Sequence, residues 1–206
     1  MKLYFSRHGQ SEANVLREFS NADHKHPLTA LGVQQAQALA AALAGKGIAR
    51  IYSSPVLRAV QTAGIVATAL GLPVTYTEAL REWSVGVLEG TRDPAGWELY
   101  DEVQAAWFYD RQLERKIPGG ESFLEIQARF TPFIEALLAQ PPGGDILLVG
   151  HGGLYRAMLP VIFSNVSFEF ALNHAFPNTA YALAETRPPG LVCLEWCGTP
   201  LETQAG

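Results

Sequence analysis

The chain has 206 residues, 48% of them hydrophobic and 17% charged, so it can bury a sizeable core as one domain and is not expected to be disordered. Fifteen Lys and Arg against twenty Asp and Glu give a net charge of −5, and the absence of a basic block argues against nucleic acid or an anionic membrane as a partner. No apolar run has the length of a membrane span, and the N-terminal apolar stretch is too short for a signal peptide, so we expect a cytoplasmic protein.

The chain opens on a short apolar run, Leu3-Tyr4-Phe5, that is typical of a buried strand. The run leads into Arg7, a permanent cation whose planar fork of donors suits phosphate or carboxylate oxygens. His8 is a candidate nucleophile because its imidazole can be neutral at cellular pH. Gly9 permits a backbone turn that a side chain would obstruct. The stretch therefore predicts an anion site with a nucleophile in it.

Residues 14–26 are polar and broken, and they predict a solvated loop at the mouth of a site. His24 and His26 are close in sequence, but a third metal ligand is lacking nearby, so we do not expect a metal site there. A helix is predicted to begin at Pro27-Leu28-Thr29 and to stop at Gly45.

Residues 49–53 predict a second strand, and Ser54-Pro55 predicts the start of a helix that runs to about Leu70. Arg58 in the first turn of this helix conflicts with the helix dipole, whose positive end disfavours a cation. Two explanations are open. Arg58 either extends to solvent, or it shares one anion with the helix N-terminus.

Residues 72–76 predict a third strand, and Glu82 follows among aromatic residues and glycines. Residue type alone favours an ordinary surface Glu there. Residues 97–114 predict one helix with an aromatic face, which forms either core or a cap over the site. We expect the basic end of this region, with Arg111, Arg115 and Lys116, to meet the far side of an anionic substrate.

The second half of the chain repeats the opening pattern. A long helix is predicted over 121–140, with a kink at Pro132. The apolar strand Asp145–Gly150 ends in His151, and a helix is predicted over 154–163. Residues 181–185 and 191–196 predict two further strands, and 198–206 a frayed tail. The cysteines at 193 and 197 would lie about 13 Å apart on one strand face, too far for a disulfide, and predict packing residues.

Alternating strands and helices predict an α/β fold, a three-layer α/β/α sandwich around a mainly parallel sheet. Such sheets bind ligands beyond the carboxyl ends of their strands. Arg7, His8, Arg58 and His151 all follow predicted strand ends, so one sheet can gather them. Two fixed cations and two imidazoles suit a tetrahedral dianion such as a phosphoryl group.

With these residues the chain resembles the histidine phosphatase superfamily, in its phosphoglycerate-mutase-like branch. The matching pieces, in order over residues 3 to about 180, are Arg7-His8-Gly9-Gln10-Ser11 with Asn14, Leu28-Thr29 with Gly32 and Gln35-Ala36, Tyr52-Ser53-Ser54-Pro55 with Arg58-Ala59 and Gln61-Thr62-Ala63, Leu80-Arg81-Glu82 with Gly86 and Glu89-Gly90, Gly119-Gly120-Glu121-Ser122, and Val149-Gly150-His151-Gly152-Gly153. The resemblance implies a single domain over 1–206, with 83–122 as a cap that determines specificity.

The resemblance also implies the role of each site residue. His8 would become phosphohistidine, while Arg7, Arg58 and His151 hold the phosphoryl oxygens. Glu82 would be the proton donor and then the base for water. Additional phosphate donors would come from Gln10, Asn14 and the Gly152 amide. The resemblance implies no metal or organic cofactor.

Three functions are compatible with these residues. A phosphatase for small phosphomonoesters is favoured, because the chain is short and the cap poor in cations. A phosphomutase would need a basic pocket for a second acidic group, which Arg115-Lys116 could imitate. A binding protein without turnover would be favoured by loss of His8, Arg58, Glu82 or His151, and all are present. The expected partner is a small phosphorylated metabolite.

Overall fold

The computed structural model describes residues 1–21, 25–141, 143–187 and 190–202. Of the predicted loop and tail, Asp23, His24 and residues 203–206 lie outside this range. The described residues form a seven-stranded sheet in the order β3-β2-β4-β1-β5-β6-β7. The strands are β1 (Lys2–Arg7), β2 (Ile48–Ser53), β3 (Val74–Tyr76), β4 (Asp145–Gly150), β5 (Tyr181–Arg187), β6 (Gly190–Trp196) and β7 (Thr199–Pro200).

The sheet has a parallel half and an antiparallel half. Strands β3, β2, β4 and β1 are parallel, whereas β5, β6 and β7 add to the edge at β1 in antiparallel order. The predicted frayed tail is wrong at residues 199–200, which pair with the end of β6. Cys193 and Cys197 are both free thiols, as predicted.

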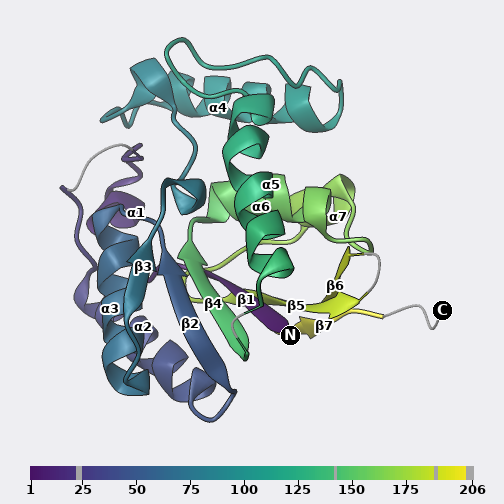
Figure 1. Ribbon diagram of the computed structural model, residues 1–206. Coiled ribbons are helices and arrows are strands. Elements are labelled where there is room, and N and C mark those ends of the chain that lie inside the picture. The colour runs from purple at the N-terminus through teal and green to yellow at the C-terminus, as the bar shows by residue number, and fades with distance from the viewer. Residues whose placement is uncertain (22–24, 142, 188–189, 203–206) are drawn as a thin grey trace.

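Helices cover both faces of the sheet, so the predicted three-layer α/β arrangement is confirmed (Figure 1). One face carries α2 (Ala30–Leu43) and α3 (Leu57–Leu70), and the other carries α5 (Phe123–Ala139), α6 (Gly152–Ile162) and α7 (Phe168–Asn173). The remaining helices are α1 (Glu12–Leu16) and α4 (Pro94–Phe108), with 3-10 turns η1 (Glu78–Leu80) and η2 (Gly86–Leu88).

Alternation along the central strands builds a core on each face. In β1, Leu3 and Phe5 belong to the core under α5 and α6, whereas Tyr4 belongs to the core under α2 and α3. In β4, Leu148 belongs to the core under α5 and α6, and Leu147 belongs to the core under α2 and α3. Successive side chains of a strand point to opposite faces, so a continuous apolar run is the pattern of a strand covered on both sides.

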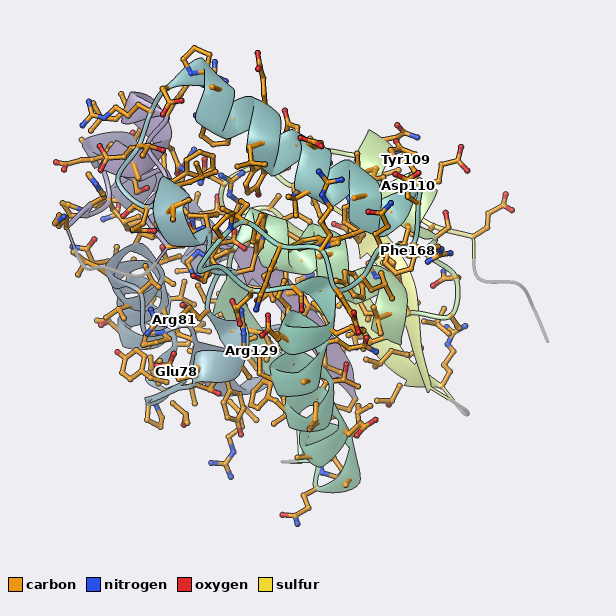
Figure 2. The ribbon with its side chains drawn as sticks, turned by 90° about the horizontal axis from the view of Figure 1, so that it is seen from above. Glu78, Arg81, Tyr109, Asp110, Arg129 and Phe168 are labelled. Carbon is orange, nitrogen blue, oxygen red and sulfur yellow. The ribbon has the colours of Figure 1, made fainter. Side chains whose placement is uncertain are left out.

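The aromatic helix α4 lies across the top of the molecule in Figure 1. Its predicted end at residue 114 is wrong, because the helix stops at Phe108 and the chain turns back. The Trp107 indole donates to the carbonyl of Arg115 across this turn (2.6 Å). Figure 2 shows Tyr109 and Asp110 beside Phe168 of α7, and the Arg111 guanidinium lies 5.2 Å from the centre of the Phe168 ring. The end of α4 is thereby packed on α7.

Candidate active site

A cavity of about 420 Å³ opens where β1, α3 and α6 meet below α4. Six of the eight predicted site residues line it: Arg7, His8, Asn14, Arg58, Glu82 and Gly152. The parallel strands β1 and β4 bring residues 7 and 150 into register, which places the loops that follow them side by side. The loop predicted at the mouth of the site contributes Glu18, Phe19, Ser20 and Asn21 to the lining.

Two hydrogen bonds fix the tautomer of His8. Its Nδ1 lies 2.6 Å from the carbonyl oxygen of Gly9, and its Nε2 accepts from Arg58 Nε (3.0 Å). Because arginine only donates, Nε2 carries the lone pair and Nδ1 carries the proton. Burial lowers the pKa of His8 well below its usual value, and the charges of Arg58 and Arg7 lower it further. His8 is therefore a neutral imidazole whose lone pair faces the cationic groups of the pocket.

Arg7 lies at the end of β1 against the start of α6. Its Nη1 donates to the carbonyl of Phe176 (2.8 Å), and among the described residues its Nε is a buried donor without a hydrogen-bond partner. A Cβ at position 152 would lie 3.2–3.4 Å from the Arg7 side chain, so the glycine lets the guanidinium pack against the helix start. A buried donor without a partner fits a site for an anion.

Arg58 connects the two histidines. It is 5% exposed, so the solvent-exposed explanation of its position is wrong. Nη1 donates to the carbonyl of Ser20, and Nη2 lies 3.2 Å from Nδ1 of His151. The same guanidinium contacts both imidazoles and can reach a phosphoryl group bound at either of them.

His151 is buried behind Arg58 and does not line the cavity. Its Nε2 lies 2.8 Å from Oγ of Ser54, and its ring centre lies 5.1 Å from that of His8. Because Arg58 donates to Nδ1, the ring donates from Nε2 to Ser54. Burial lowers the pKa of His151 as well, with the charge of Arg58 next in importance.

Glu82 sits on the N-terminus of α6 and is 9% exposed. Its carboxylate accepts from the backbone amides of Gly153 (2.9 Å) and Leu154 (2.6 Å), and from Trp83 N (3.1 Å). A Cβ at position 153 would lie 2.8–2.9 Å from both carboxylate oxygens, so a glycine there leaves room for them. Burial raises the pKa of Glu82 although Arg58 and these amides oppose the shift, and a raised pKa is what a proton donor needs.

The segment that carries Glu82 is held from below by α5. Arg129 donates to the carbonyls of Glu78 and Ala79 and pairs with Glu121 (2.8 Å), and Glu121 in turn accepts from Ser84 N. Figure 2 shows Arg129 beside Glu78 and Arg81. The backbone on both sides of Glu82 is thus fixed, on one side by Arg129 of α5 and on the other by Glu121 just before that helix.

The two predicted amide side chains differ in position. Asn14 lines the cavity, and its Oδ1 accepts from Ser11 N (3.1 Å) and Asn178 Nδ2 (3.3 Å), which leaves Nδ2 as the donor. Gln10 is not in the cavity wall, and its Oε1 accepts from Thr29 Oγ1 (2.9 Å). The structure therefore places Asn14, but not Gln10, in the wall of the cavity.

Two residues that support the nucleophile were not singled out from the sequence. Asn178 Nδ2 donates to the carbonyl of His8 (3.0 Å). Thr62 Oγ1 accepts from Gly9 N (3.0 Å) and donates to the carbonyl of Arg58 (2.7 Å). Thr62 belongs to one of the matching motifs, but its contact with Gly9 spans 53 positions of the chain and that of Asn178 with His8 spans 170. Local sequence carries no signal of such distant pairing.

Residues of α4 form the far wall of the cavity, and Arg156 of α6 also lines it. The expectation that Arg111, Arg115 and Lys116 meet the substrate is wrong. None of them lines the cavity, because Arg115 pairs with Glu102 and Lys116 with Glu125 on the surface, and Arg111 lies over the Phe168 ring. Within the described residues there is no group of three or more His, Cys, Asp and Glu placed to hold a metal ion, and no helix there is long and apolar enough to cross a membrane.

The chain is similar in sequence to a probable phosphoglycerate mutase and in structure to phosphatases. The chain is 38% identical to a probable phosphoglycerate mutase of Proteus mirabilis over 162 residues, which are 79% of this chain and 74% of the relative. Its structure is similar to that of a mycobacterial glucosyl-3-phosphoglycerate phosphatase in complex with VO3, with TM-score 0.81, 26% identity, and 95% and 98% of the two chains covered.

An α-ribazole phosphatase of Shigella flexneri shares the fold, with TM-score 0.79 and 24% identity over the whole of both chains. The family model of the histidine phosphatase superfamily (branch 1) matches residues 3–199. The chain therefore belongs to the histidine phosphatase superfamily.

Proposed function

We propose that the chain is a metal-independent phosphatase that hydrolyses small phosphomonoesters through a phosphohistidine on His8. The observation that carries the proposal is the tautomer of His8, whose Nε2 lone pair lies in a pocket with Arg7, Arg58 and the carboxyl group of Glu82. A neutral imidazole beside fixed cations is a nucleophile placed where an anionic phosphoryl group binds.

Two steps account for the reaction. In the first, Nε2 of His8 forms a bond to phosphorus, the bond from phosphorus to the ester oxygen breaks, and Glu82 gives its proton to that oxygen. In the second, Glu82 takes a proton from water, the water oxygen bonds to phosphorus, and the bond from phosphorus to nitrogen breaks. Phosphate leaves, and the original protonation states of His8 and Glu82 are restored.

Arg58 has a defined part in the first step. Its Nε–H is hydrogen bonded to the lone pair that must attack phosphorus. A phosphoryl group that reaches Nε2 replaces this hydrogen bond, and the guanidinium then donates to phosphoryl oxygens instead. Arg7 Nε, Asn14 Nδ2 and the Gly152 amide supply donors from the opposite side.

Hydrolysis is favoured over a mutase reaction by the charges of the far wall. A mutase needs a basic pocket for a second acidic group, but Arg115 and Lys116 lie outside the cavity in surface ion pairs. Besides Arg7 and Arg58, Arg156 is the one Lys or Arg side chain among the described residues that line the cavity, and Asp101 lines it as well. A mutase remains the second candidate, because the Proteus mirabilis relative has that name.

Release of phosphate from p-nitrophenyl phosphate in EDTA tests the proposal, with His8→Ala as the control. We expect turnover that the substitution abolishes, and a phosphoryl group on the peptide that contains His8 after rapid quenching. A label on another residue, or binding of phosphate without turnover, would contradict it. Supplying 3-phosphoglycerate with its bisphosphate and measuring 2-phosphoglycerate against free phosphate separates mutase from hydrolase.

A further inference from the structure

The wall of the cavity opposite His8 is one face of α4. Trp97, Tyr100, Asp101 and Gln104 line the cavity, and their spacing of three, one and three positions puts them on the same side of the helix. The helix therefore presents a carboxylate and a carboxamide, together with two aromatic residues, to whatever is attached to the phosphoryl group.

The two aromatic residues each use one ring face to pack against the protein. Tyr100 stacks on Trp83 with ring centres 4.6 Å apart, and Trp97 stacks on Phe19 at 4.0 Å. These contacts reduce the aromatic surface that is left for a flat ring of a substrate. The polar groups of α4 are accordingly the better candidates for contact with the leaving group.

The side-chain amide of Gln104 is available to a ligand in the cavity. The residue is 8% exposed and lines the cavity, and its carboxamide contacts no donor or acceptor among the residues that the structure describes. A carboxamide in a cavity wall that has no protein partner is free to bind a polar group of a ligand. A hydroxyl group both donates and accepts, and it can satisfy either end of the carboxamide.

The charges around Gln104 favour a neutral leaving group. Asp101 lies one turn away on the same face and can accept from hydroxyl groups, but it repels a carboxylate. Arg156 donates to the carbonyls of Ala171 (3.2 Å) and Leu172 (2.9 Å), which hold it on the end of α7. Glu18 is paired with Arg92 and His26. Asp101 is thus the charged side chain that α4 presents to the leaving group.

We propose that Asp101 and Gln104 are specificity-determining residues that bind hydroxyl groups of the leaving group. The preferred substrates are then phosphomonoesters of neutral, polyhydroxylated molecules, such as sugar or polyol phosphates. This inference rests on the proposed phosphatase function.

Three substrates of similar size test it: glycerol 3-phosphate, propyl phosphate, which lacks both hydroxyls, and 3-phosphoglycerate, which has a carboxylate in place of one hydroxymethyl group. For the wild-type protein we expect kcat/KM for glycerol 3-phosphate to exceed those for the other two by about tenfold or more. Gln104→Leu and Asp101→Asn should each reduce the preference for glycerol 3-phosphate over propyl phosphate about tenfold. Asp101→Asn should also weaken the discrimination against 3-phosphoglycerate.

Glu98→Gln is the matched control, since Glu98 is an exposed residue of α4 outside the cavity wall. It should leave all these ratios at the wild-type values. Equal use of propyl and glycerol phosphates by the wild-type protein, or a preference for 3-phosphoglycerate, would overturn the inference while the phosphatase proposal stands. Failure to hydrolyse even p-nitrophenyl phosphate would refute the phosphatase function, and the inference with it.

Discussion

Ser54→Ala tests whether the buried histidine behind Arg58 must be held in one orientation. Ser54 and His151 both have 0% exposure, and the bond between Ser54 Oγ and His151 Nε2 is 2.8 Å. Removal of the hydroxyl leaves a buried ring N–H without a partner, which costs about 1–3 kcal/mol. For a chain of this size, that loss corresponds to a fall in Tm of about 2–12 °C.

The same substitution should slow turnover, because Nδ1 of the His151 ring supports the Arg58 guanidinium (3.2 Å). If the ring moves, Arg58 loses one of its two imidazole contacts. We expect kcat/KM for p-nitrophenyl phosphate to fall about tenfold, equivalent to about 1.4 kcal/mol of transition-state stabilisation.

Ser53→Ala is the matched control. Ser53 is also fully buried, but its hydroxyl donates to the carbonyl of Ser54 (2.9 Å) and not to His151. Thermal melts and steady-state kinetics of both variants should show a fall in Tm for each, and loss of kcat/KM for Ser54→Ala alone. Wild-type kinetics for a folded Ser54→Ala protein would refute the positioning of Arg58 through His151.

The remaining predictions concern the proton donor, the pH profile and the core. Glu82→Gln should lower kcat/KM about 10²–10⁴-fold for an alkyl phosphate and much less for p-nitrophenyl phosphate, whose leaving group needs no proton; equal losses on the two esters would exclude Glu82 as the acid. Because burial raises the pKa of Glu82 and lowers that of His8, kcat/KM should fall on the alkaline side as Glu82 loses its proton, and on the acid side only below the usual histidine range as His8 gains one. Glu82→Gln should remove the alkaline fall, and its persistence would assign that limb to another group. Phe130→Ala, at a position with 0% exposure, should cost about 3–5 kcal/mol in a denaturant melt, whereas Leu124→Ala, at a 40% exposed position of the same helix, should change stability by about 0.5 kcal/mol or less; similar losses for both would contradict the core between α5 and the sheet.

Local sequence is enough to predict the strands and the site residues that follow them. The apolar runs at 3–5 and 145–150 predict β1 and β4, and the polar residues directly after those runs predict the nucleophile and the second imidazole. These features depend on near neighbours only, because alternation, strand ends and helix starts are set within a few residues. Helix α4 is predicted from the sequence as well. Its end is not, because the end depends on contacts that residues 107–111 make with other parts of the chain.

The sequence by itself determined that an α/β sheet would gather Arg7, His8, Arg58 and His151 at one edge. Only the tertiary structure decided what each group does there: which nitrogen of His8 keeps its lone pair, that His151 lies behind Arg58, and that Glu82 is buried on a helix N-terminus. It also decided that Gln104 faces the cavity and that Arg115 does not. The physical reason is that burial, tautomer and pKa are set by the atoms packed around a group, and most of these atoms come from residues far away in the chain.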